Sequence, residues 1–341
     1  MQFTPARWTF FLCCLCYFGA AQTASSPLLN YRISVESGWT SAHLSSLDND
    51  ISPTVRLNGK FSIRKKSRAF AWQLNGQFRP ELFLSGDVPT HLKYGVAGTI
   101  QRSFRKWQWV VSASADARRL SIGFQTFTLQ KWSAETQLIW QLNPRTQLKF
   151  GSGADLLNAK NILENRMTAG RFFVMWQRQF SRAFRGQLGL TGDPFVIKES
   201  FSGDSNAGYR MGAVVSITRQ KTWIWQMRYH GILHHSEFTQ SPSSEHWLHL
   251  LTGRIFANNW SVLFLADYRF RKFTFVENAP LNLLYSPYDD DRKVYLKIEK
   301  DFSNTSQLFF LFGYQSEDLF NLQSRYYGWR GLIGVEFGKS R

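Results

Sequence analysis

Cysteine is confined to the start of this 341-residue chain, at Cys13, Cys14 and Cys16. The remaining residues therefore hold no disulfide bond and no cysteine-bound metal ion. After residue 21 the chain also lacks any run of 18 apolar residues, which excludes a membrane-spanning helix in that part of the sequence. No proline-rich or serine-rich stretch divides it, so we expect a single domain.

Residues 1–21 have the pattern of a secretory signal peptide. Arg7 supplies positive charge, residues 8–18 form a short apolar core, and Ala20 and Ala21 are small residues that suit cleavage before Gln22. The apolar core is too short to span a membrane, although an N-terminal membrane anchor stays open as the alternative. We expect residues 1–21 to be removed and residues 22–341 to form the folded domain.

Acidic residues are few, with 24 Asp and Glu against 41 Lys and Arg, so the formal net charge is +17. Such an excess often marks a protein that binds nucleic acid. Here the basic residues are scattered along the whole chain rather than gathered in a tail or on one helix face. We therefore expect no nucleic-acid partner.

Short polar turns recur at a nearly constant interval. Their centres lie about 38 residues apart, with a last interval of about 45, and a strand-like run flanks each of them on both sides. The turns are Lys65-Lys66-Ser67, Arg105-Lys106, Asn143-Pro144, Ser181-Arg182, Gln220-Lys221, Asn258-Asn259 and Ser303-Asn304. Even spacing of short strands is typical of a closed antiparallel β-barrel.

The runs between the turns predict sixteen strands, most of them longer than the 9–11 residues that a tilted strand needs to cross a bilayer. The predicted strands are residues 29–40, 52–64, 68–83, 92–104, 106–118, 128–142, 145–156, 168–180, 183–194, 207–219, 222–234, 246–257, 260–273, 290–302, 305–316 and 326–337.

Apolar and polar residues alternate within these strands, most clearly in residues 55–63, 223–230 and 294–302. This period of two gives each strand an apolar and a polar face. A soluble β-sandwich or β-propeller, which stays open as the alternative, would turn the apolar face inward, whereas a membrane barrel turns it toward lipid. Aromatic residues favour the barrel because they gather near the short turns, as in an interfacial girdle. They are Trp107, Trp140, Phe180, Phe184, Trp223 and Trp260.

The final strand has the same character. Tyr327, Trp329, Ile333, Val335 and Phe337 share one face, and Phe337 stands close to the C-terminus. In this pattern the chain resembles bacterial outer-membrane β-barrel proteins of the porin-like class. The resemblance implies an all-β, up-and-down transmembrane barrel with its short turns on the periplasmic side. It also implies contact with outer-membrane lipid and lipopolysaccharide, and insertion by the barrel-assembly machinery.

With the apolar face outward, the predicted interior is polar and basic. The candidate pore-lining bases are Arg56, Lys60, Lys149, Arg210, Arg228, Lys297 and Arg330, and the candidate acids are Glu135, Asp155, Asp267 and Glu299. Unpaired bases in a narrow lumen favour anions, because the low-dielectric wall keeps their field focused. The alternative is that bases and acids pair and simply fill the interior. The longest connection, residues 274–289, is long enough to fold inward and constrict the opening.

Three other groups of residues bear chemistry without a complete motif. Five histidines are close in sequence and could together bind a metal ion, although their spacing matches no known metal-binding motif. They are His230, His234, His235, His246 and His249. Residues 289–291 are three consecutive aspartates without the rest of a calcium loop. Ser236 beside His234 and His235, or Ser243 and Ser244 with His246, could form a nucleophile and base, but no orienting acid is evident. The solvated or structural interpretation is favoured for each, so we expect no cofactor.

We therefore expect an outer-membrane pore for passive diffusion of small solutes, with anions preferred, rather than an enzyme. Two alternatives remain open. The first is a barrel that does not conduct and serves as a scaffold or as a secretion or assembly partner. The second is a barrel enzyme that modifies lipids.

Overall fold

The computed structural model describes residues 28–41, 43–44, 51–67, 69–84, 90–122, 125–160, 164–199, 205–237, 243–272, 292–319 and 324–339. The first half of the chain contains β1 (Leu28–Ser41), β2 (His43–Leu44), β3 (Ile51–Lys66), β4 (Phe70–Phe83), β5 (Thr90–Phe104), β6 (Trp107–Ile122), β7 (Gln125–Asn143), β8 (Thr146–Lys160) and β9 (Glu164–Gln179). The second half contains β10 (Phe184–Glu199), β11 (Ser205–Gln220), β12 (Trp223–Ser236), β13 (Ser243–Ile255), β14 (Trp260–Lys272), β15 (Arg292–Ser303), β16 (Ser306–Leu319) and β17 (Ser324–Lys339), with a short 3-10 turn at Ala257–Asn259.

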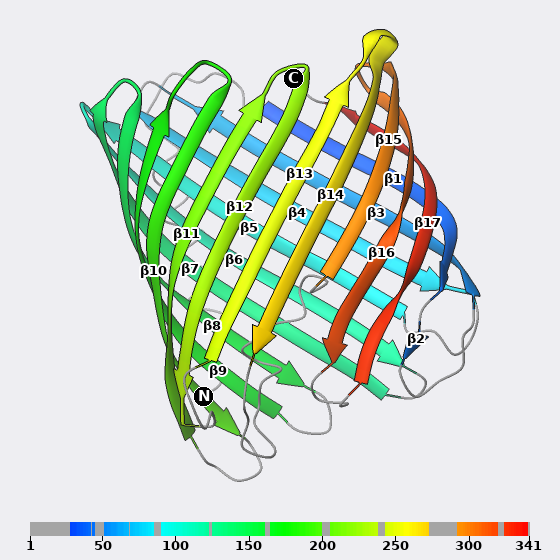
Figure 1. Cartoon of the computed structure of the whole chain (residues 1–341), viewed down its shortest axis with the longest axis horizontal. Coiled ribbons are helices and arrows are strands. Elements are labelled where there is room, and N and C mark those ends of the chain that lie inside the picture. Colours follow the sequence, from blue (N-terminus) through cyan, green and yellow to red (C-terminus); the bar gives the residue numbers. More distant parts are fainter. Residues whose placement is uncertain are drawn as a thin grey trace.

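These strands form one closed antiparallel barrel. Each long strand pairs with its neighbours in sequence, and β1 pairs with β17 from Tyr31 opposite Lys339 to Thr40 opposite Arg330, which closes the wall (Figure 1). β2 adds two more residues of pairing to β17 just beyond the end of β1. Counting β1 and β2 as one interrupted strand, the described residues form a sixteen-stranded barrel. Closure leaves no unpaired edge in the sheet, as a structure surrounded by lipid requires. A sandwich of two sheets and a propeller are both excluded.

The predicted strands are confirmed. All sixteen coincide with observed strands, and the clearest differences are extensions at the ends away from the short turns; β8, for example, continues to Lys160 rather than ending at residue 156. A hydrogen-bonded ladder can continue beyond the apolar belt into water, where alternation is no longer needed. No helix in the described residues is long and apolar enough to cross a membrane.

The seven short turns lie together on one rim, the upper rim in Figure 1, which we call the turn rim. Two of these turns need left-handed backbone: Arg105 has φ 47°, and Asn258 and Asn259 have φ near 60°. Asparagine tolerates this conformation better than most residues, which explains its place in the 3-10 turn. The other ends of the strands form the opposite rim, which we call the loop rim.

The outer face of the wall is apolar. On β1 the side chains of Leu29, Ile33 and Val35 are exposed, while Ser34 and Glu36 between them are buried inside. The same alternation continues around the barrel, so a continuous apolar surface faces outward, which is the reverse of a soluble protein.

Aromatic and basic side chains border this surface near the turn rim. Trp107 and Trp140 stack with ring centroids 5.2 Å apart. The guanidinium of Arg254 lies 5.2 Å from the centre of the Trp223 ring, and the ammonium of Lys300 lies at the same distance from Trp260. Amphipathic side chains of this kind suit the boundary between hydrocarbon and water. Part of the basic excess therefore belongs to the outer rim rather than to the interior.

Three regions singled out in the sequence lie outside the described residues: the predicted signal peptide, the connection 274–289 and the aspartates 289–291. The described barrel falls within the predicted domain of residues 22–341.

Candidate functional site in the barrel interior

The interior differs between its two ends. Toward the loop rim, many inward polar side chains are at most 9% exposed. They are Ser34, Glu36, Thr40, Ser52, Thr54, Glu81, His91, Arg118, Asp155, His234, Ser236, Ser243, Glu245, Gln315 and Arg330. Toward the turn rim, inward side chains such as Arg185 and Arg228 are exposed. The loop-rim half is therefore more tightly packed, and the turn-rim half is more accessible to water.

A cavity of about 720 Å³ occupies the side of the interior formed by β7 to β14. It extends from Arg185, Thr218 and Gln226 near the turn rim to Leu157 and Met167 toward the loop rim. Seven basic side chains and three acidic ones line it: Lys131, Lys149, Arg171, Arg185, Arg210, Arg228 and Arg269 against Glu135, Asp155 and Asp193. The cavity is therefore strongly basic.

The acids of the cavity all take part in ion pairs. Arg171 pairs with Asp155 and, at 3.3 Å, with Glu135. Lys131 lies 3.4 Å from Asp155, and Arg210 lies 3.5 Å from Asp193 across β10 and β11. These pairs form a neutral layer about midway along the strands.

Three bases on the turn-rim side of that layer behave differently. Lys149 on β8, Arg185 on β10 and Arg228 on β12 line the same cavity, and none forms an ion pair with a carboxylate of the described chain. We call them the basic trio. Their charge is not balanced locally, so it acts on whatever enters the cavity.

The barrel seam, where β1 meets β17, contains a second group of charges. Arg330 on β17 reaches past β1 and β3 and places its Nη2 2.8 Å from Oε1 of Glu81 on β4. Arg56 pairs with Glu36 on the neighbouring strand. Threonine and serine at Thr40, Ser52 and Thr54 are small enough to leave room for the long side chains. Arg56 and Arg330, both predicted to line a pore, thus lie in largely buried ion pairs.

The remaining predicted lining residues are spread around the wall. Lys60 is exposed and borders a separate hollow of about 480 Å³ shared with Gln77 and Asp116. Lys297 pairs with Glu299, and its ammonium also lies 4.5 Å from the centre of the Phe309 ring.

Asp267 accepts contacts from two neighbours. The ring of His249 approaches it from β13, and the ammonium of Lys293 lies 3.2 Å away on β15. The structure therefore brings Lys149, Arg210, Arg228, Glu135 and Asp155 together in the large cavity and leaves the other six candidates elsewhere.

Sequence reasoning missed five charged residues of the cavity: Lys131, Arg171, Arg185, Asp193 and Arg269. Arg171 illustrates the difficulty, because it precedes a continuous apolar run at residues 172–176 that hides the period of two. The inward phase of β9 could have been counted backward from Gln177, which shares its face.

The five candidate histidines do not converge. His230, His234 and His249 point inward, whereas His235 packs beside Tyr209 and His246 stacks on Tyr229 at the outer face. No group of three metal-ligating side chains occurs in the described parts of the chain. Consecutive strand residues face opposite sides, which explains why neighbours in sequence separate.

One of the serine–histidine contacts considered from the sequence is present, since Nε2 of His234 lies 3.0 Å from Oγ of Ser236. Both side chains are buried, His234 completely. Ser243 is buried inside, whereas Ser244 and His246 belong to the other face of β13. A nucleophile that no substrate can reach does not support catalysis.

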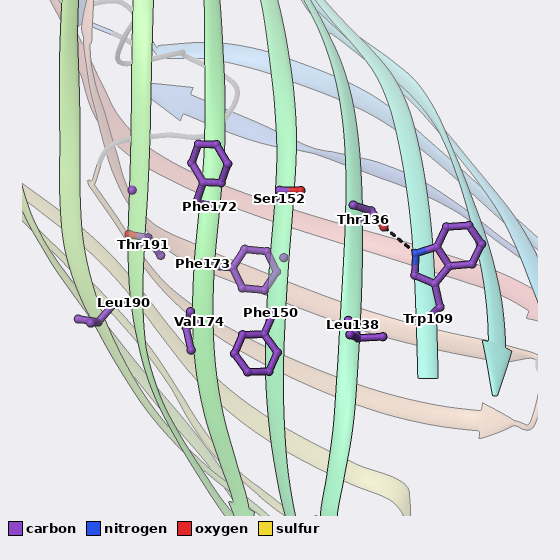
Figure 2. Close-up of a pocket in the computed structure, with 12 residues that line it drawn as sticks. Trp109, Thr136, Leu138, Phe150, Ser152, Phe172, Phe173, Val174, Leu190 and Thr191 are labelled. Atoms are coloured by element: carbon purple, nitrogen blue, oxygen red, sulfur yellow. Dashed lines mark hydrogen bonds between the residues drawn. The ribbon is translucent and has the colours of Figure 1, made fainter. Parts of the chain in front are cut away.

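The outer wall has a shallow apolar hollow across β6 to β10. Figure 2 shows Phe150, Phe172, Val174 and Leu190 around it, with the indole N–H of Trp109 donating to Oγ1 of Thr136 at 2.8 Å. Ser152, which has a small side chain (Figure 2), and Gly192, which has none, leave the space. The hollow belongs to the apolar surface and suits acyl chains.

The chain matches no protein-family model and no curated protein sequence. Among solved structures it is similar to CdiB from Acinetobacter baumannii, with a TM-score of 0.51, 10% identity, 93% of this chain covered, and 61% of the length of CdiB spanned. Weaker likenesses include the Pseudomonas putida toluene transporter TodX (TM-score 0.41, 10% identity, 93% and 90% covered) and Acinetobacter baumannii OccAB4 (0.41, 9%, 94% and 99%). At these identities the likeness concerns the fold alone: this chain has the closed antiparallel barrel of outer-membrane proteins, as the porin-like resemblance predicted.

Proposed function

We propose that this protein is an outer-membrane channel through which small solutes diffuse, with anions preferred. In this proposal a signal peptide of residues 1–21 is removed on export, and the barrel-assembly machinery inserts the rest. The apolar outer face then contacts membrane lipid and lipopolysaccharide. The turn rim faces the periplasm.

The observation that carries the proposal is the basic trio. Lys149, Arg185 and Arg228 come from three different strands and have no acidic partner in the described residues, yet they line one cavity. Positive charge inside a low-dielectric wall lowers the energy of an entering anion and raises that of a cation. The paired residues Arg171, Asp155 and Glu135 contribute much less, because their fields largely cancel.

The packed loop-rim half sets the expected size of the current. Buried side chains such as Glu81 and Arg330 leave little free cross-section there. We therefore expect small conductance steps rather than those of a wide water-filled pore.

The test is single-channel recording of the purified, refolded chain in a planar bilayer with a KCl gradient. The expected result is small conductance steps with a reversal potential shifted toward the equilibrium potential of chloride. The triple variant Lys149→Gln, Arg185→Gln, Arg228→Gln should move the reversal potential toward the equilibrium potential of potassium. The matched control Arg254→Gln removes one positive charge from the outer rim and should leave it unchanged.

An unchanged reversal potential in the triple variant would contradict the role of these bases. The packed loop-rim half also supports one alternative, a barrel that does not conduct and serves as a scaffold or secretion partner. Complete absence of steps from correctly folded protein would favour that alternative.

A further inference from the structure

The cavity wall combines two chemistries that a plain ion pathway does not require. Beside the basic trio, it includes the apolar side chains of Phe173 and Met175 on β9, Ile232 on β12 and Trp247 on β13. Inward positions of a membrane barrel are normally polar, because they face water. Four large apolar side chains at such positions mark a surface suited to an apolar partner.

The two chemistries occupy neighbouring places in the sheet. Met175 stands directly opposite Lys149 in the β8–β9 ladder, so an apolar and a cationic side chain share one cross-strand pair. On β12, Arg228 and Ile232 are four residues apart on the same face, a separation of about 13 Å along a strand. The basic end lies toward the turn rim, and the apolar end lies deeper.

Glycines on the neighbouring strands allow two of these apolar side chains to lie close against the barrel wall. A Cβ atom on Gly151 would lie 2.1 Å from the ring of Phe173, and one on Gly189 would lie 2.6 Å from Cγ of Met175. The two apolar side chains therefore lie flat across the neighbouring strands instead of filling the lumen. Gln187 donates to the sulfur of Met175 at 2.7 Å, which holds that side chain in place.

Trp247 bounds the other side of the cavity. The guanidinium of Arg269 lies 4.2 Å from the centre of its ring, and its indole N–H donates to Glu245. The ring of His230 meets it edge-on at 5.5 Å, while Nε2 of His230 lies 3.1 Å from Oγ1 of Thr191. These contacts restrain an aromatic wall opposite Phe173 and Met175.

We propose that the cavity is a binding site for a small organic anion with an apolar body, and thus selects among the anions that enter. The anionic group pairs with Lys149, Arg185 and Arg228, and the apolar body lies against Met175 and Trp247, over the buried side chains of Phe173 and Ile232. A volume of about 720 Å³ is in the range of small-molecule sites. The inference deepens the proposed function, since it names the class of solute for the same lumen.

The test is isothermal titration of the detergent-solubilised, folded full chain with 4-phenylbutyrate, using empty micelles as the blank. Acetate keeps the charge without the apolar body, and 4-phenylbutan-1-ol keeps the body without the charge. We expect 4-phenylbutyrate to bind at least about tenfold more tightly than either. Equal affinity for acetate and 4-phenylbutyrate, or no saturable binding, would overturn the proposal.

Variants separate the two parts of the site. Arg228→Gln should weaken 4-phenylbutyrate binding about tenfold or more, since it removes a charged partner. Met175→Gln should weaken 4-phenylbutyrate and leave the affinity for acetate unchanged. Arg254→Gln, on the outer rim, is the control and should bind as the wild type does. Wild-type affinity in both cavity variants would place the ligand elsewhere and overturn the proposal.

Binding and conduction are measured separately. Conductance with anion preference but without selective binding would support the channel proposal and overturn the proposal of an organic-anion site. Selective binding without conductance keeps the site and removes the channel.

Discussion

At the scale of single residues, the most constrained charges are at the seam. Arg330 and Glu81 lie three strands apart and have side chains that are 5% and 2% exposed. A buried ion pair contributes little over well-packed apolar residues, but breaking one leaves an uncompensated charge. The ion pair of Arg330 and Glu81 therefore links β17 to β4 across β1 and β3, near the place where the barrel closes.

Glu81→Gln should destabilise the barrel by about 3–5 kcal/mol, because it removes the carboxylate charge that lies 2.8 Å from the buried guanidinium of Arg330. The measurement is urea-dependent unfolding from lipid vesicles, followed by tryptophan fluorescence. The double variant Glu81→Leu, Arg330→Met should recover most of the loss. If Glu81→Gln were as stable as the wild type, the ion pair of Arg330 and Glu81 would have no role in barrel closure.

At the scale of elements, most strands follow from the sequence and β9 shows where the inference fails. Alternation and the turn residues predicted all sixteen strands, because a period of two depends only on which face meets water and which meets lipid. In residues 172–176 both faces are apolar, so facing could not be assigned there. Phe173 and Met175 share the inward face of Arg171 and Gln177, and the glycines Gly151 and Gly189 on the neighbouring strands provide the space that they fill, which the sequence of β9 alone does not reveal.

The pairing of β1 with β17 depends on close backbone contact. A Cβ atom on Gly38 would lie 1.9 Å from the carbonyl oxygen of Gly331, whereas one on Gly192 would meet nothing within 4 Å. Gly38→Ala should therefore impair closure, and Gly192→Ala, which adds the same methyl group, should not. The check is the shift in gel mobility between folded and heated protein. Equal folded fractions in the two variants would show that the contact does not limit closure.

At the scale of the whole molecule, one orientation governs everything else: apolar side chains turn outward and charged ones inward. The sequence predicted this from the aromatic residues near the turns, and the closed wall agrees with it. The division of the interior into a packed half and an accessible half was not predicted. It arises from contacts between strands that lie far apart along the chain, such as β4 with β17.

The orientation can be tested with one pair of substitutions on β10. Leu190 is 67% exposed on the outer face, so Leu190→Arg should destabilise the barrel in lipid by about 2–4 kcal/mol. Gln187→Arg on the inner face of the same strand should have little effect, because the side chain stays in water. Folding titrations into vesicles measure both. A larger loss for Gln187→Arg would mean that the faces are reversed.

The sequence by itself determined the number of strands, their facing outside residues 172–176 and the basic interior, since these follow from local alternation and composition. Only the tertiary structure decided which charges are paired. Ion pairs such as Arg171 with Glu135 and Asp155 join different strands, and register sets their distances. Among the residues that the structure describes, the same register leaves Lys149, Arg185 and Arg228 without acids and places them beside an apolar surface. Charge can be counted along a chain, but its balance depends on which side chains the closed wall brings within reach.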